Sequence, residues 1–112
     1  MVGSAYVPDR GDIVWVNFNP TRGHEQKGKR PALVLSSKFY NTRSGLAVVV
    51  PITAQIKGYP FEVSIEAGSV QGVVLADQLR SVDWHIRRMT LVGRVPGSTI
   101  AEIQKKISAL LL

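Results

Sequence analysis

The chain has 112 residues, 45% hydrophobic and 20% charged, which allows one modest core but not two ordinary domains. Its formal net charge of +6 favours an anionic partner, and its lack of cysteine excludes disulfides and thiolate chemistry, as is typical of a cytoplasmic protein. The longest apolar stretch, residues 46–52, is far shorter than the roughly 20 residues that cross a bilayer, so we expect one domain over residues 1–112 and no membrane span.

The first predicted strand covers residues 12–18, which are rich in β-branched and aromatic side chains. Val14, Val16 and Phe18 fall on one face of it. A polar, glycine-punctuated segment follows over residues 19–29, before strand character resumes at residues 31–36. The pattern therefore predicts a hairpin with a long loop.

Further short strands are predicted along the rest of the chain. The apolar run at residues 46–52 lies between breaks at 41–45 and 57–60, and residues 61–66 alternate between apolar and polar as a half-buried strand does. The remaining strand-like segments, at residues 72–76, 79–82 and 89–95, are spaced as in a barrel or sandwich. We therefore expect a mainly β protein with a strongly bent antiparallel sheet.

The last segment has a helical pattern instead. Either Ser98 or Thr99 is predicted to cap a helix that starts just after Pro96 and Gly97, and Thr99 and Glu102 have the spacing of a capping box. An apolar stripe with helical period follows, made of Ile100, Ile103, Ile107, Leu110 and Leu111. This stripe packs either on the sheet of the same subunit or against a second subunit.

The excess positive charge lies in one window, residues 22–57. This window holds one acid, Glu25, and seven basic residues, namely Arg22, Lys27, Lys29, Arg30, Lys38, Arg43 and Lys57, whereas the rest of the chain holds seven of each sign. A polyanion such as a nucleic acid is the expected partner of such a window, although single lysines also serve to solubilise loops.

Two other kinds of site can be set aside. Residues 23–30 nearly match a phosphate-binding P-loop, but Arg30 replaces the hydroxyl residue that holds magnesium, and a strand follows where a helix is required. The two histidines, His24 and His85, have no partner at ligand spacing, so we expect no metal and no cofactor. They remain an alternative acid–base pair.

Seven short blocks of residues, spread along the chain, are informative when their order and spacing are considered together. The blocks are Gly11-Asp12-Ile13, Phe18-Asn19-Pro20-Thr21, Glu25-Gln26, Arg30-Pro31-Ala32, Val50-Pro51-Ile52-Thr53, Lys57-Gly58-Tyr59-Pro60-Phe61-Glu62-Val63 and Ala76-Asp77-Gln78. Together they resemble the MazF/PemK family of toxins, and the resemblance runs from about Tyr6 to the end. It implies an SH3-like barrel with a C-terminal α-helix. It also implies a homodimer that cleaves single-stranded messenger RNA without metal at a short motif, and a MazE-like antitoxin with an acidic C-terminal tail.

The resemblance implies that Arg30 and Thr53 are the catalytic pair, because they lie at the Arg-Pro and Pro-X-Thr positions. The chemistry of these groups is compatible. In metal-free cleavage the 2′-hydroxyl of RNA attacks the neighbouring phosphorus, and a guanidinium and a short hydroxyl stabilise the charge on the phosphoryl oxygens. A guanidinium keeps its proton, so we take Glu25 as the first candidate for a general base and His24 as the second.

Other side chains near these positions are candidates for binding RNA. Phe18 and Tyr59 are candidates for stacking on bases, Lys27 and Lys57 for contacting phosphates, and Gln26 and Gln78 for reading base edges. Phe18 also fits a partly buried position, because it shares a face with Val14 and Val16.

Two other functions stay open. A small basic barrel can bind single-stranded RNA without cutting it. A toxin on a similar barrel can target a protein, as the CcdB-like gyrase poisons do, although those lack the Arg-Pro and Pro-X-Thr blocks found here.

Overall fold

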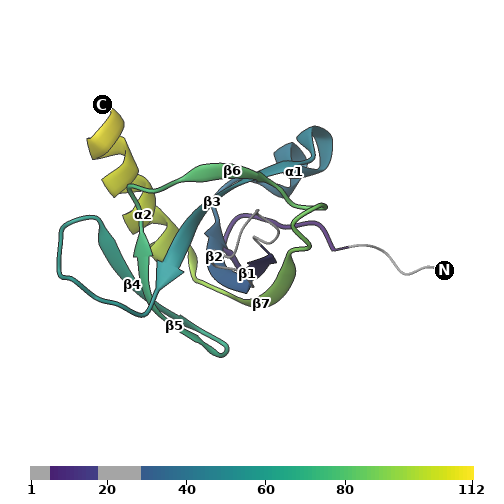
Figure 1. The fold of residues 1–112 in the computed structure, drawn as a ribbon. Coiled ribbons are helices and arrows are strands. Elements are labelled where there is room, and N and C mark those ends of the chain that lie inside the picture. The colour runs from purple at the N-terminus through teal and green to yellow at the C-terminus, as the bar shows by residue number, and fades with distance from the viewer. Residues whose placement is uncertain (1–5, 18–28) are drawn as a thin grey trace, which may run out of the picture.

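The computed structural model describes residues 6–17 and 29–112 (Figure 1). Within these ranges it contains β1 (Asp12–Asn17), β2 (Lys29–Val34), α1 (Lys38–Ser44), β3 (Leu46–Thr53), β4 (Glu62–Ala67), β5 (Val70–Leu75), β6 (Arg80–Asp83), β7 (Thr90–Arg94) and α2 (Gly97–Leu111). The predicted site residues Phe18, Glu25, Gln26 and Lys27 lie outside the described residues, as does His24.

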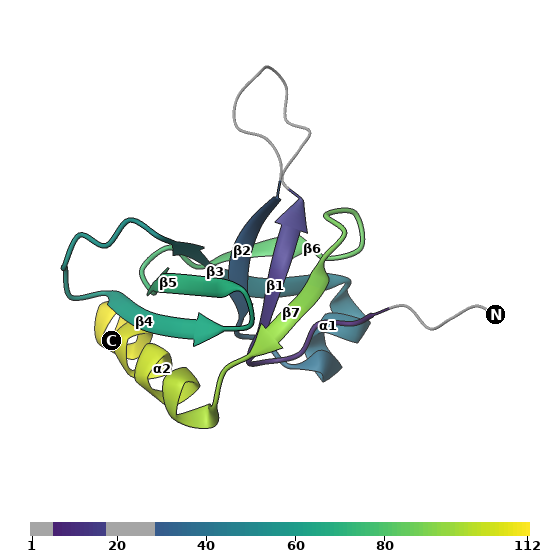
Figure 2. The ribbon, with the colours of Figure 1, turned by 90° about the horizontal axis from the view of Figure 1, so that it is seen from below.

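The strands form one bent antiparallel sheet in the order β4-β5-β3-β2-β1-β7, with β6 paired to β3. Strand β3 is where the sheet bends. Its first half pairs with β6, its middle pairs with β2, and Ile52 and Thr53 at its end pair with Val74 and Val73 of β5. As a result the β4–β5 hairpin runs across the direction of β1, β2 and β7 (Figure 2). The predicted bent, mainly β fold is confirmed.

Two hydrophobic clusters lie on the two faces of the central strands. Side chains alternate across a strand, so Ile13 and Leu33 belong to one cluster, whereas Val14 and Val34 belong to the other. The first cluster lies between the two halves of the bent sheet and includes Ile103 of α2. Burial on both faces holds the paired parts of β2 and β3, residues 32–34 and 49–51, in fixed relation to each other, whereas Lys29 and Arg30 at the start of β2 are exposed.

A short helix, α1, occupies most of the segment where the sequence predicted a break at residues 41–45. Phe, Tyr, Asn and Thr are weak helix formers, so contacts with the rest of the chain hold this helix in place. Asp9 accepts a hydrogen bond from the backbone N of Lys38 at 2.8 Å, and buried Asn41 donates from Nδ2 to the carbonyl of Pro8 at 2.8 Å. Gly45, at φ 77°, then ends the helix.

The C-terminal helix α2 is confirmed, but its predicted cap is wrong. The helix begins at Gly97 with Pro96 as the N-cap and without a side-chain cap, so Ser98 and Thr99 already lie inside it. Ile100 and Ile103 are buried within the subunit, whereas Leu110 and Leu111 stay 44% and 67% exposed. Neither helix in the described part of the chain combines the length and apolar character that crossing a membrane requires.

Candidate functional site

Arg30 and Thr53 lie on neighbouring antiparallel strands, near the point where those strands separate. Ala32 pairs with Pro51 and Leu33 with Val50, and the same register continued by two residues places Arg30 across from Thr53. Side chains at directly opposite positions point to the same face of a sheet. The pairing itself stops earlier, because the end of β3 turns to β5.

A pocket of about 550 Å³ opens at this separation, and both Arg30 and Thr53 line it. Lys29, Ser69 and Gln71 also line it, as does Trp15. Trp15 is half-buried and packs against the first hydrophobic cluster, as expected of a packing residue, while it also forms part of the pocket wall. The structure thus brings the two predicted catalytic residues into one hollow, one from each strand.

The hydroxyl of Thr53 is oriented by the turn that follows it. Its Oγ1 accepts a hydrogen bond from the backbone N of Gln55 at 3.1 Å. A hydroxyl oxygen that accepts from a backbone N–H keeps its own proton for donation to another acceptor. Thr53 is therefore available as a donor to an oxygen bound in the pocket.

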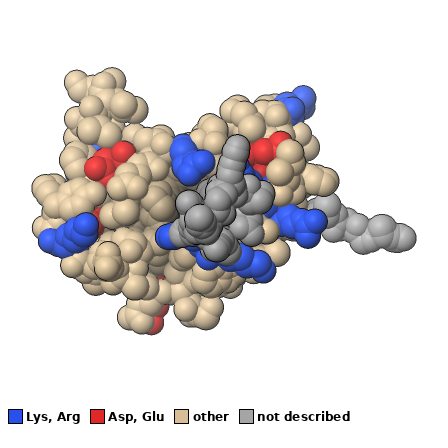
Figure 3. All heavy atoms as spheres, viewed as in Figure 1, with Lys and Arg blue, Asp and Glu red and all other residues tan. Residues whose placement is uncertain are grey.

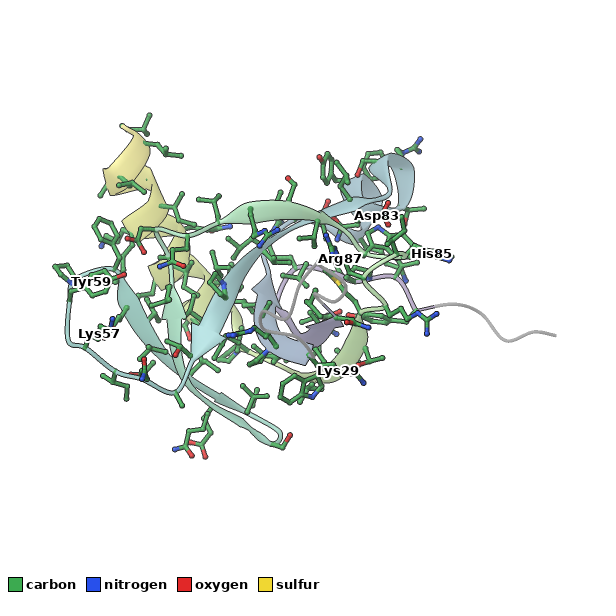
Figure 4. The ribbon with its side chains drawn as sticks, viewed as in Figure 1. Lys29, Lys57, Tyr59, Asp83, His85 and Arg87 are labelled. Carbon is green, nitrogen blue, oxygen red and sulfur yellow. The ribbon has the colours of Figure 1, made fainter. Side chains whose placement is uncertain are left out.

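A second, smaller pocket of about 130 Å³ lies on the other side of Thr53, which lines both. It contains three of the predicted RNA-binding residues, Lys57, Tyr59 and Gln78. In Figure 4 Lys57 and Tyr59 lie on the connection from β3 to β4, and Lys29 lies on the other side of the end of β3. We call the two pockets together the β3 groove.

The walls of the second pocket are held by hydrogen bonds. The carboxylate of Glu62 accepts from the backbone N of Lys57 at 2.9 Å and of Gly58 at 2.8 Å, which fixes the loop before β4. The hydroxyl of Tyr59 donates to Asp77 Oδ1 at 3.4 Å. The removal of water from that hydroxyl raises the pKa of Tyr59, and the negative charge of Asp77 raises it further. Tyr59 therefore stays a neutral hydrogen-bond donor at neutral pH.

The β3 groove is basic. Lys29 and Arg30 line its first pocket and Lys57 lines its second, whereas Glu62 is the one acid among the described lining residues. The Glu62 carboxylate is already bonded to backbone N–H groups, and Figure 3 shows Lys and Arg side chains spread across the middle of this face. An anionic ligand with several charges therefore fits the groove.

The alternative pair of histidines receives no support from the described residues. His85 lies in the turn between β6 and β7, beside Asp83 and Arg87, and stacks on Trp84 with 6.2 Å between ring centroids (Figure 4). It does not line either pocket of the β3 groove. Within residues 6–17 and 29–112, no three His, Asp or Glu side chains gather as metal ligands do.

Sequence reasoning missed three polar residues of the groove, Gln55, Ser69 and Gln71. Gln71 is exposed on β5, next to buried Val70, and Ser69 lies in the β4–β5 turn. For Gln71 the sequence offers one signal, a polar residue within a strand-like segment that is otherwise apolar. That signal predicts that Gln71 is exposed, but it does not predict that Gln71 lies near Thr53.

Comparisons with known proteins agree with each other. The family described as "PemK-like, MazF-like toxin of type II toxin-antitoxin system" matches residues 9–111. The chain is 48% identical over 108 residues to the endoribonuclease toxin MazF of Escherichia coli strain K12, covering 96% of this chain and 97% of the relative. It is 36% identical to the endoribonuclease PemK of Escherichia coli, covering 92% of this chain and 81% of the relative. The MazE-MazF crystal structure (Form-II) from Deinococcus radiodurans superposes with a TM-score of 0.89 at 51% identity, covering 96% of this chain and 97% of that one.

Proposed function

This chain belongs to the PemK-like, MazF-like family of endoribonuclease toxins of type II toxin–antitoxin systems, and from that premise we propose that the β3 groove is its active site. The observation that carries the proposal is that Arg30 and Thr53, from two strands, line one basic pocket. The activity is cleavage of RNA. The catalytic pair is Arg30 and Thr53.

The reaction uses a nucleophile that RNA itself supplies. The 2′-oxygen gives up its proton to a base and forms a bond to the neighbouring phosphorus, while the bond from phosphorus to the 5′-oxygen breaks and the 5′-oxygen takes up a proton from water. The products are a 2′,3′-cyclic phosphate and a 5′-hydroxyl. Arg30 presents its guanidinium to the phosphoryl oxygens and Thr53 donates a hydrogen bond from its hydroxyl to one of them, so that both stabilise the charge that develops there.

Glu25 is proposed as the base that takes the proton from the 2′-hydroxyl, because a guanidinium does not give up its own proton. Phe18, Gln26 and Lys27 are proposed to contact the RNA. These four residues lie outside the described part of the chain, and the proposal for them rests on the family resemblance.

The two pockets suggest how the substrate lies. With the scissile phosphate at Thr53, the nucleotides on its two sides enter different pockets. Lys57 meets a phosphate, while Tyr59 and Gln78 contact the base in the smaller pocket. Bases that enter separate pockets must be unstacked, so the substrate is single-stranded RNA. That it is messenger RNA, cut at a short motif to block translation, follows from the family resemblance.

The partner is a MazE-like antitoxin, and a related toxin has been solved as a MazE-MazF complex. A groove that attracts phosphates also attracts the proposed acidic C-terminal tail of the antitoxin, which would block access of RNA. We further propose a cytoplasmic homodimer. Exposed apolar residues, among them Ile86, Leu91, Leu110 and Leu111, offer apolar surface that a second subunit can cover.

A matched pair of substrates tests this function. One oligonucleotide is all RNA, and the other carries a single 2′-deoxy nucleotide on the 5′ side of the cleavage site, both with EDTA present. We expect the RNA to be cut, with a cyclic phosphate on one fragment and a 5′-hydroxyl on the other, and the deoxy substrate to stay whole. RNA that is bound but left intact would instead favour the non-catalytic barrel, and cleavage of the deoxy substrate would exclude attack by the 2′-hydroxyl.

A further inference from the structure

Gly72, on β5, lies against the backbone of Thr53 at a distance that leaves no room for a side chain. A Cβ atom built on Gly72 would lie 2.3 Å from the carbonyl oxygen of Thr53, 3.0 Å from its carbonyl carbon and 3.3 Å from the Cα of Ala54. All three are main-chain atoms, which cannot rotate away as the end of a flexible side chain can. The contact therefore fixes how closely β5 approaches the end of β3.

Space, rather than backbone conformation, is the reason for a glycine here. The described glycines with positive φ are Gly11, Gly45, Gly58 and Gly68, and Gly72 does not belong to that group. The backbone conformation of Gly72 therefore does not require glycine, and a glycine inside a strand is unfavourable unless another group approaches it closely. Here the carbonyl group of Thr53 makes that close approach.

Thr53 depends on β5 for its position. Ladder pairing between β2 and β3 stops at Ala32 and Pro51, so at Thr53 the neighbouring strand is β5, through the pair Thr53 and Val73. We propose that Gly72 is a positioning residue for Thr53, one that lets β5 hold the end of β3 so that the Thr53 hydroxyl faces Arg30 across the first pocket. This inference rests on the proposed catalytic role of Thr53.

The size of the required shift sets the expected effect. A methyl group at position 72 has to move the Thr53 carbonyl from 2.3 Å to beyond about 3.0 Å, because real Cβ contacts are essentially never shorter. Catalytic groups need to stay within about 0.5 Å of their productive place. A misplacement of about 1 Å can cost about 100-fold in rate. Gly72→Ala is therefore expected to slow the chemical step by about that factor without removing any group that contacts RNA.

Gly93 provides a matched control. It also lies inside a strand, β7, it is not among the glycines with positive φ, and a Cβ there would meet its nearest atoms at 3.4 Å, which is ordinary contact. Gly72→Ala and Gly93→Ala thus change strand propensity alike and differ in the clash with Thr53. For each variant we would measure the single-turnover rate on a short RNA, the affinity for the 2′-deoxy analogue, and the Tm.

The expected result is a rate about 100-fold lower for Gly72→Ala than for Gly93→Ala, with similar affinity and similar Tm. In the Thr53→Val background Gly72→Ala should lower the rate no further, because its effect passes through Thr53. A Gly72→Ala rate within about threefold of the Gly93→Ala rate would overturn the inference. So would equal losses in both backgrounds, or loss of the fold, because the clash is inferred to be absorbed locally at Thr53 and Ala54.

The failure of the inference can be told apart from the failure of the proposed function. If Thr53→Val alone cleaves RNA as the wild type does, the catalytic role of Thr53 is wrong whatever Gly72→Ala does. If Thr53→Val is inactive and Gly72→Ala is active, only the positioning role of Gly72 is wrong.

Discussion

Replacing Thr53 with valine removes the hydroxyl proposed to donate, beside Arg30, to a phosphoryl oxygen, while it keeps the branched shape of the side chain. Loss of one such donor typically lowers the rate of the chemical step by about 100-fold to 1,000-fold, or about 2.7–4 kcal/mol of transition-state stabilisation. Thr53 is half-buried, and the hydrogen bond that its Oγ1 accepts from Gln55 N is 3.1 Å long and exposed. Losing that bond should lower the free energy of unfolding by no more than about 1 kcal/mol.

The two magnitudes make the experiment decisive, because catalysis should change much more than stability. Single-turnover cleavage of a short RNA with enzyme in excess reports the chemical step, and binding of the 2′-deoxy analogue reports affinity, which should stay unchanged. Thr53→Ser, which keeps the hydroxyl, should retain activity within about tenfold of the wild type. A Thr53→Val enzyme that cleaves within about threefold of the wild type would refute the assignment of Thr53 as a donor.

Three further predictions concern other parts of the structure. Asn41→Asp replaces the buried Nδ2 donor to the carbonyls of Pro8 and Ser36 with an acceptor, so the free energy of unfolding in urea should fall by about 3 kcal/mol, and a loss below about 1 kcal/mol would contradict this. The hydrogen bond from Lys38 N, first among several causes, lowers the pKa of Asp9 below its ordinary value of 3.8. The ionised Asp9 carboxylate therefore stabilises the fold above pH 3.8, and this stabilisation is lost as the pH falls through the lowered pKa. The Tm difference between wild type and Asp9→Asn should therefore shrink below pH 3.8, and a constant difference would be against it. Gln78→Glu loses the amide donor and gains a charge in the smaller pocket, so mapped cleavage ends should shift to other sequences, and an unchanged motif would remove Gln78 from base recognition.

The sequence predicted those parts of the fold that depend on local alternation. Val63 and Ile65 are buried on β4 as the pattern required, since a strand with one face in a core repeats every second residue. The assignment of Arg30 and Thr53 as a catalytic pair comes from the family resemblance. The register of β2 and β3, continued by two residues, places the two residues opposite each other. The pattern alone places Arg30 just before the predicted strand at residues 31–36 and Thr53 just after the apolar run at residues 46–52.

The features that were missed depend on contacts between distant segments. Helix α1 has weak intrinsic propensity and is held by Asp9 and by the hydrogen bonds of Asn41, so nothing within its own residues predicts it. The predicted cap at Ser98 or Thr99 is wrong because Pro96 is already the N-cap and its carbonyl accepts a hydrogen bond from Thr99 N. The role of Gly72 is likewise invisible until β5 lies beside β3.

The central claim is that a guanidinium on β2 and an alcohol on β3 act on the same phosphate. The most direct test is the cleavage of one defined RNA, with EDTA present, by the double variant Arg30→Ala and Thr53→Ala. We predict that the folded double variant leaves the RNA whole while the wild type cuts it at one motif. Measurable cleavage at that same motif by the double variant would contradict the claim.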